Sequence, residues 1–375
     1  MYNTNYSDYY IQPDPASLLQ RDMAPFFTVF DTTVDWPQPK QIRFRGQFVL
    51  DPADCFDELR QRFEWHGFTP IIREEDDGQI ALIALPYVFD PPDSRWIVNL
   101  LLFVATVFST LYIGAIYETG DLELGLREIW RGWPFSFSIM LILGAHELGH
   151  YFAARYHKVP VTLPYFIPLP TSFSLIGTLG AFIQLKAPVK NKRALLDVGV
   201  SGPLAGLVFA LPIFWYGLAT SNVAPLPSYP FYYEGNSLVY ILSKLVIFGE
   251  MLPGGGQDVY LNQMAWAGWV GLFVTGMNLM PVGQLDGGHI SYVLFGQRAK
   301  RFYWPVIISL GLLMVITQTY TWGLWLVLLI VFGRRYAEPL DDITPLDSRR
   351  RAIAIFSLVV FVFVFVPTPF SIMTP

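Results

Sequence analysis

The stretch Leu143–His157, LGAHELGHYFAARYH, places two histidines and a glutamate in an otherwise apolar segment. His146 and His150 are four residues apart, so on a helix their imidazoles share one face. That spacing suits two ligands of a tetrahedral zinc ion. Glu147 lies near enough to take a proton from a metal-bound water and pass it to a leaving amine. The three residues therefore predict a hydrolytic zinc site.

A structural alternative is a helix in which two buried histidines and a glutamate match this spacing by chance. The chain has only 5 histidines, and ionisable residues inside membrane spans are costly and usually functional. These two facts favour the metal site.

A catalytic zinc needs a third protein ligand, and the residues just after His150 supply none. The metzincin pattern would place a histidine ten residues after His146, where this chain has Tyr156. His157 misses that position by one residue. The third ligand must therefore come from elsewhere in the chain.

The best remaining candidate is the segment 275–291, TGMNLMPVGQLDGGHIS. Pro281 and Gly283 interrupt a helix there and free the backbone to turn. Asp286 follows, and the two glycines after it leave room for close approach to another element. The alternative is a helix C-cap, in which Asp286 only solvates a turn. We favour Asp286 as a ligand because both motifs are expected in the same leaflet.

The composition places most of the chain in a membrane. Of 375 residues, 53% are hydrophobic and 15% are charged, against about 25% charged residues in a soluble domain. Residues 1–94 carry 7 Lys/Arg and 16 Asp/Glu, a net charge of −9, whereas the remainder has a net charge of +4. This distribution favours the lipid bilayer as a partner and argues against nucleic acid. The single cysteine, Cys55, excludes an intrachain disulfide.

The chain divides into four regions. Residues 1–40 are expected to form an extended arm, without a cleaved signal peptide. Residues 41–90 form a small α+β domain, in which 41–86 read as β-α-β-β. Residues 91–95 are a linker. Residues 96–375 are the membrane domain.

Seven apolar segments approach the length that crosses a bilayer. They are residues 96–117, 134–155, 195–219, 262–282, 303–318, 320–333 and 352–367. The fifth and sixth segments are short and have the alternative of being one long helix. Placing every basic loop cluster in the cytosol requires a cytosolic N-terminus and two separate crossings within 303–333. Residues 238–250 then lie on the outer face or re-enter, and the HExxH segment lies near the cytosolic leaflet.

The pair of motifs HELGH and NLMPVGQLDGGH resembles the site-2 proteases, intramembrane zinc metalloproteases that cleave transmembrane helices. The signatures of that family are HExxH and NxxPxxxxDG, and both match without gaps. The small-residue segment SGPLAG at 201–206 is also similar. The resemblance covers about 134–295, the expected catalytic core.

Carried over by position, the resemblance implies Zn²⁺ bound by His146, His150 and Asp286, with Glu147 as the general base. It also implies Asn278 as a polar group that stabilises the oxyanion. His289 would orient a ligand, or be a plain interfacial histidine. We see no inserted PDZ-like domain, so the chain looks closer to the PDZ-less prokaryotic and plastid members.

The segment 173–186, FSLIGTLGAFIQLK, is apolar, broken by glycine and too short to span. We expect a membrane-associated β-hairpin around Gly177–Gly180, as the resemblance also implies. Its exposed strand, with Gly177, Thr178, Leu179 and Gly180, would hold an extended substrate by strand addition. The alternative is a loop packed against the second span.

These observations together predict a polytopic α-helical membrane protein with about seven transmembrane helices, a β-hairpin and an N-terminal α+β cytosolic domain. Its expected function is zinc endopeptidase cleavage of transmembrane protein substrates near the cytosolic leaflet. One alternative is a CaaX-type membrane peptidase, although those use a glutamate as the third ligand. Another is a metal transporter or inactive relative, although transporters distribute ligands along a path. The N-terminal domain would bind a regulator, substrate or another copy of the chain.

Overall fold

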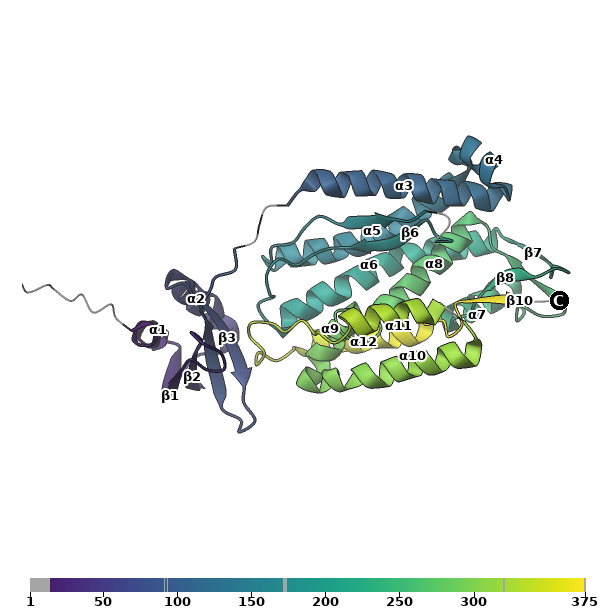
Figure 1. The fold of residues 1–375 in the computed structure, drawn as a ribbon. Helices are drawn as coiled ribbons and strands as arrows, with labels where there is room; N and C mark the ends of the chain where they lie inside the picture. Colours follow the sequence, from purple (N-terminus) through teal and green to yellow (C-terminus); the bar gives the residue numbers. More distant parts are fainter. Residues whose placement is uncertain (1–13, 91, 93, 171–173, 320, 374–375) are drawn as a thin grey trace, which may run out of the picture. The chain divides into compact units, whose positions relative to one another are not determined.

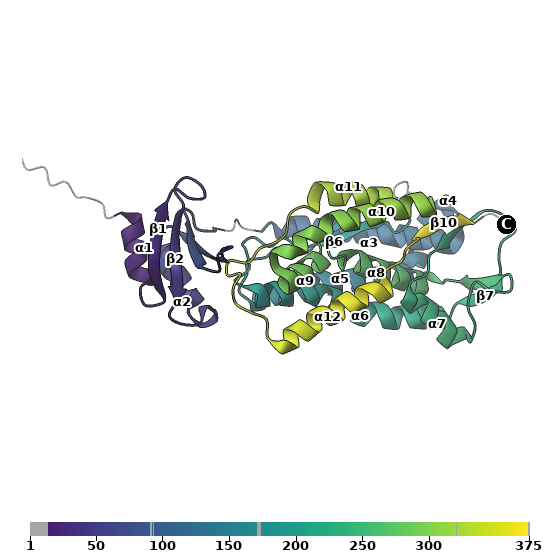
Figure 2. The same ribbon diagram turned by 90° about the horizontal axis from the view of Figure 1, so that it is seen from below.

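The computed structural model describes residues 14–90, 92, 94–170, 174–319 and 321–373. The chain forms two compact units, drawn in Figures 1 and 2. Unit 1 is Met1–Asp90 with Pro339–Pro345, and unit 2 is Pro91–Glu338 with Leu346–Pro375. Each unit has its own hydrophobic core.

Unit 1 is a four-stranded antiparallel sheet with two helices. Its elements are α1 (Pro15–Met23), β1 (Phe27–Val34), β2 (Ile42–Phe48), α2 (Pro52–Trp65), β3 (Thr69–Glu74) and β4 (Ile80–Leu85). The strand order is β1-β2-β4-β3. Alternate strand residues face the helices, so Phe44 and Ile72 are fully buried with Leu19, Phe56 and Phe63.

The predicted extended arm at 1–40 is wrong for the part that the structure describes. Asp14 caps α1 by accepting a hydrogen bond from the backbone N–H of Ala16, and β1 pairs along its length with β2. Leu19 and Met23 are buried one helical turn apart. Because β1 is an edge strand with mostly exposed residues, its sequence lacks the alternation that identifies a strand. Residues 1–13 lie outside the described residues.

A second correction concerns 339–345, which the sequence places in the membrane domain. This segment extends the sheet of unit 1. The Ile72 N–H donates to the Leu340 carbonyl at 2.8 Å, and the Asp342 N–H donates to the Ile72 carbonyl at 3.2 Å. The buried carboxylate of Asp341 accepts from the backbone N–H groups of Ile343 and Thr344 at 3.0 and 3.1 Å. A short polar segment held by backbone bonds gives no periodic signal in the sequence.

Unit 2 is helical. Its α-helices are α3 (Trp96–Thr119), α4 (Leu122–Arg127), α5 (Trp133–Tyr156), α6 (Lys192–Ala219), α7 (Leu238–Phe248), α8 (Gln263–Asn278), α9 (Asp286–Phe295), α10 (Tyr303–Thr317), α11 (Thr321–Phe332) and α12 (Ser348–Val364). Helices α5, α6 and α8 contact one another at the centre, and α3 covers α5 (Figure 1). Figure 2 shows α12 beside α6 and α8, which it contacts together with α9.

Three helical stretches within the described residues are long and apolar enough to cross a membrane: Trp96–Thr119, Lys192–Ala219 and Asp286–Thr317. The third stretch runs through α9, the 3-10 helix Gly296–Phe302 and α10. Helices α10 and α11 are separate, and α10 ends at Thr317, followed by the C-cap Gln318 in a left-handed conformation. This architecture is that of a membrane protein.

A small β-ribbon lies beside α5. Strand β5 (Tyr165–Pro168) pairs antiparallel with β6 (Thr178–Phe182), and a bridge between Val161 and Leu185 extends the pairing. The predicted strand residues Gly177–Gly180 lead into and form β6, so the expected hairpin is present. Gly177 and Gly180 both have positive φ, and the register shifts between Ile167 and Pro168. The strand is therefore irregular at the glycines.

Unit 2 contains two further two-stranded ribbons. Strand β7 (Asn222–Pro225) pairs with β9 (Gln257–Tyr260), and β8 (Phe231–Glu234) pairs with β10 (Phe370–Met373).

We predict that Asp341→Ala releases segment 339–345 from β3. The substitution leaves the buried backbone N–H of Thr344 and the partly buried one of Ile343 without their acceptor, which costs about 1–3 kcal/mol. In hydrogen exchange of the full chain in detergent, the amides of Ile72 and Asp342 should exchange faster. The free energy of local opening obtained from their rates should fall by that amount. Asp76→Ala, at the exposed tip of the β3–β4 turn, serves as the control. Equal protection in both variants would contradict this role of Asp341.

Candidate functional site

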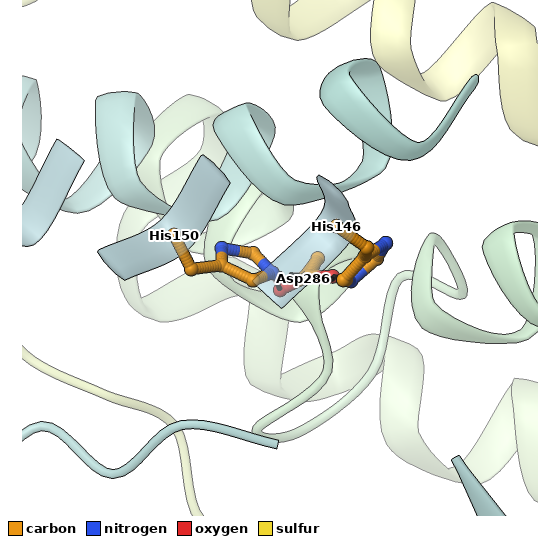
Figure 3. Close-up of side chains that lie close together, drawn as sticks. All are labelled: His146, His150 and Asp286. Atoms are coloured by element: carbon orange, nitrogen blue, oxygen red, sulfur yellow. Dashed lines mark hydrogen bonds and ion pairs between the residues drawn. The ribbon is translucent and has the colours of Figure 1, made fainter. Parts of the chain in front are cut away.

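Helix α5 carries three polar residues on a buried face. Its first turn contains Pro134, which is favoured at this position because its missing N–H has no helical partner there. His146, Glu147 and His150 follow in its second half and are 4%, 4% and 6% exposed. The histidines lie on one face, as their spacing predicts, and Figure 3 shows both rings directed towards Asp286.

Asp286 is the first residue of α9, reached by a tight turn after α8. Any side chain at Gly287 would place its Cβ 1.9 Å from the Leu279 carbonyl oxygen, and at Gly288 it would lie 2.2 Å from the Gly283 carbonyl oxygen. Only glycine fits positions this close to backbone. The two glycines therefore let the chain fold back and direct Asp286 towards α5.

The three side chains form a compact group of donor atoms. His146 Nε2 and His150 Nε2 are 3.2 Å apart, and they lie 3.4 and 3.3 Å from the two carboxylate oxygens of Asp286. Ligands about 2.0–2.1 Å from a tetrahedral zinc are separated by about 3.3 Å. Both the donor set and its spacing therefore fit a zinc ion with three protein ligands.

A backbone carbonyl fixes the orientation of His150. His150 Nδ1 lies 2.7 Å from the carbonyl oxygen of Val198 on α6, so an Nδ1–H donates there and Nε2 faces the site. At Gly202, one turn further along α6, a Cβ would lie 2.0 Å from His150 Nε2. The glycine therefore provides the space that this imidazole occupies.

An ion-pair network holds the part of α6 that contains Val198. Asp197 accepts from Arg350 of α12 at 2.8 and 2.6 Å, and it lies 2.9 Å from His157 Nε2, just after α5. Sequence reasoning missed both Asp197 and the Val198 carbonyl. A backbone carbonyl has no residue-type signal, and the only available clue was the small-residue segment SGPLAG, which predicts close contact of α6 with α5.

Glu147 and Asn278 line the same cavity, which has a volume of about 230 Å³. Glu147 Oε2 is buried and has no hydrogen-bond partner among the described residues. Asn278 Nδ2 lies 3.2 Å from His146 Nε2. His289 also lines the cavity, and its Nδ1 is likewise buried without a partner within the described chain. The cavity thus contains a carboxylate and an amide beside the three donor atoms.

The predicted hairpin residues are divided between two places. Three residues of the β6 segment, defined as β6 with the following Ile183, line the cavity of Glu147: Ala181, Phe182 and Ile183. Thr178, Leu179 and Gly180 line a second, apolar cavity. The carbonyl of Gly177 accepts a hydrogen bond from Ser109 of α3 at 2.6 Å. The predicted substrate-binding stretch 177–180 therefore lies just before the part of the strand that reaches the polar site.

Comparison with known proteins gives matches in sequence. Residues 134–317 match the model of peptidase family M50. The chain is 30% identical over 308 residues to a rice protein named probable zinc metalloprotease EGY1, chloroplastic. It is 28% identical over 366 residues to the Arabidopsis thaliana protein named probable zinc metalloprotease EGY2, chloroplastic. No solved structure matches the chain.

Each alignment covers a larger share of this chain than of the relative. The match to the rice protein covers 74% of this chain and 51% of the relative, and the match to the Arabidopsis protein covers 92% of this chain and 63% of the relative. The chain thus spans between half and two thirds of these relatives. The family match includes the predicted site residues that line the cavity, which are His146, Glu147, His150, Asn278 and Asp286. The chain therefore belongs to peptidase family M50, the site-2 protease family of zinc metalloproteases.

Proposed function

We propose that this chain is an intramembrane zinc endopeptidase that hydrolyses peptide bonds in transmembrane segments of other proteins. The observation that carries the proposal is the group of three donor atoms, 3.2–3.4 Å apart, beside the buried Glu147, whose Oε2 has no hydrogen-bond partner among the described residues. The relatives named zinc metalloproteases support zinc as the metal.

His146, His150 and Asp286 would hold the zinc ion. When bound, zinc supplies Lewis-acid activation of a water molecule and of the scissile carbonyl. Glu147 accepts the proton of the attacking water and donates it to the leaving amine. The Asn278 amide donates a hydrogen bond to the oxyanion that develops on the carbonyl oxygen. The carbonyl of Val198 keeps the His150 ring in the tautomer and orientation that these steps need.

The substrate segment must be extended at the cut, because a helical peptide bond is shielded by its own hydrogen bonds. Strand β6 pairs with β5 on one edge and has no other partner among the described strands. It also contacts α5. A substrate strand added to the free edge of β6 would run along α5 past Glu147.

The proposal includes the membrane arrangement expected from the loop charges. Seven helices cross the membrane, the N-terminus is cytosolic, and the His146 end of α5 lies near the cytosolic leaflet. The N-terminal unit is then available to a cytosolic regulator or to a second copy of the chain. The substrates are transmembrane proteins.

The zinc site predicts a clear loss of metal in Asp286→Ala. Wild-type protein purified in detergent should contain about one zinc per chain by elemental analysis. Asp286→Ala should lose most of it, since two histidines alone bind weakly. Asp121→Ala, which removes a carboxylate at the N-cap of α4, is the control and should retain the metal. Full zinc occupancy in Asp286→Ala would remove this residue from the ligand set.

Gly202→Ala should weaken zinc binding without removing any ligand. Its Cβ would lie 2.0 Å from His150 Nε2, so the ring must move. We expect zinc affinity, measured by chelator competition, to fall about 10- to 100-fold. Gly144→Ala on α5 is the matched control, because a Cβ there meets no atom within 4 Å. If both alanine variants bind zinc equally, the glycine does not position the ligand.

Glu147→Gln separates metal binding from proteolysis. The amide cannot accept the proton, so cleavage should fall about 10²- to 10⁴-fold, while zinc content stays at the wild-type level. The assay would use purified protein in liposomes and a designed single-span protein whose leucine-rich segment is interrupted by Gly-Pro. Cleavage at the wild-type rate by Glu147→Gln would refute its role as general base. Absence of cleavage by wild type across a panel of such proteins would refute the proposed function.

A further inference from the structure

A second cavity is lined by residues close in the chain to those of the polar site, and its lining is mostly apolar and has no charged side chain. Its volume is about 340 Å³, and five elements surround it: α5, the β6 segment, α8, α11 and β10. The large side chains in its wall are Leu143, Leu179, Phe273, Trp325, Leu328 and Phe370. The size and lining are those of a site for an apolar group.

On three elements, residues that line the apolar cavity are followed closely in the chain by residues that line the polar site. On α5, Ile139 and Leu143 line the apolar cavity, and His146 and Glu147 follow in the polar cavity. On α8, Val274 lines the first cavity and Asn278 lines the second. On each helix, the nearest residues that line the two cavities are therefore about one helical turn apart.

Strand β6 makes the same passage. Leu179 and Gly180 line the apolar cavity, and Ala181, Phe182 and Ile183 line the polar one. Since α5, β6 and α8 all show this order, an extended chain running along β6 would meet both cavities in succession.

The spacing of residues on α5 gives the distance between the apolar cavity and the peptide bond opposite Glu147, counted in residues of the bound chain. Ile139 and Leu143 precede Glu147 by eight and four residues, which on a helix is about 12 and 6 Å. An extended chain advances about 3.3 Å per residue. The apolar cavity is therefore two to four residues from the peptide bond opposite Glu147.

We propose that the apolar cavity is a specificity subsite of this enzyme, which binds a bulky apolar side chain of the substrate two to four residues from the scissile bond. This inference rests on the proposed function and adds to it a sequence requirement. Leucine, isoleucine and phenylalanine fit the lining, whereas a charged side chain would be left without a partner there. The occupant is a substrate side chain instead of a lipid because the cavity shares the β6 segment with the polar site.

Helix α11 offers a matched pair of variants. Leu328 lines the cavity, whereas its neighbour Val327 is 60% exposed on the outer surface of the unit and is absent from the cavity wall. Leu328→Trp fills the subsite, and Val327→Trp adds the same bulk outside it.

The first experiment measures cleavage of the designed single-span protein in liposomes. Mass spectrometry locates the cut, and leucines within four residues on either side are replaced one at a time by alanine. In wild type and Val327→Trp, alanine at one position two to four residues from the cut should lower kcat/KM at least about tenfold. In Leu328→Trp that preference should be lost. Identical profiles in the two tryptophan variants, or no selective position, would overturn the subsite.

A second experiment tests occupancy without cleavage. The natural Cys55 is replaced by serine, so that a cysteine at Leu328 or Val327 is the only thiol of the chain. In a Glu147→Gln background and with a mild thiol oxidant such as diamide as the electron acceptor, a single-span protein with a cysteine at the selective position should form a disulfide with Leu328→Cys and not with Val327→Cys. Equal disulfide formation at both positions, or a lipid retained at Leu328 in native mass spectrometry without any disulfide, would overturn the proposal.

The two experiments distinguish failure of the proposed protease function from failure of the proposed subsite. Cleavage by wild type without selectivity or disulfide formation would keep the protease and remove the subsite. Selective disulfide formation without cleavage of any substrate would keep the binding site and remove the protease.

Discussion

The close approach of α6 to α5 is the constraint on which the polar site depends. A side chain at Gly149 would place its Cβ 2.5 Å from the Ser201 carbonyl oxygen, and one at Gly202 would meet the His150 ring at 2.0 Å. Small residues on both helices therefore bring the two backbones together. Only at this separation can the Val198 carbonyl accept from His150 Nδ1 at 2.7 Å. The geometry of the ligand is thus set by glycines that bear no functional group.

The same contact explains why α5, which is otherwise mostly apolar, tolerates several ionisable residues. Two imidazoles and a carboxylate converge from α5 and α9, and each would be costly in an apolar interior without a partner. Their donor atoms lie 3.2–3.4 Å apart, a distance that a cation among them would stabilise. The network of Asp197, His157 and Arg350 further holds α6 to the end of α5 and to α12. The polar residues are therefore grouped where other polar groups compensate them.

Sequence reasoning could locate the site because its information is local. The spacing of His146 and His150 depends only on helix geometry, and the interruption at Pro281 and Gly283 marks the turn that delivers Asp286. The hairpin could be predicted only in part, because the sequence indicates a strand around Gly177–Gly180 and does not identify its partner, residues 165–168. Pairing between separate segments cannot be read from one strand.

Long-range pairing also limited the prediction for unit 1. Strand β1 has few buried residues, so its place in the sheet depends on β2. Segment 339–345 is separated from β3 by more than 250 residues and joins it through backbone groups at Ile72. Backbone hydrogen bonds require no particular side chain, and the buried Asp341 alone hints at a fixed turn. Composition and periodicity therefore do not indicate such contacts.

The division of α5 into an apolar and a polar part bears on how such a site would select its substrate. On α5, Ile139 and Leu143 line the apolar cavity, and His146, Glu147 and His150 line the polar one. On α8, Val274 and Asn278 line the two cavities in the same order. A bound chain would therefore be apolar beside one part and have an exposed, hydrated peptide bond beside the other. A fully apolar helix satisfies only the first requirement, and a soluble loop satisfies only the second. The arrangement favours the boundary of a transmembrane segment, where an apolar stretch meets residues that leave the helix readily.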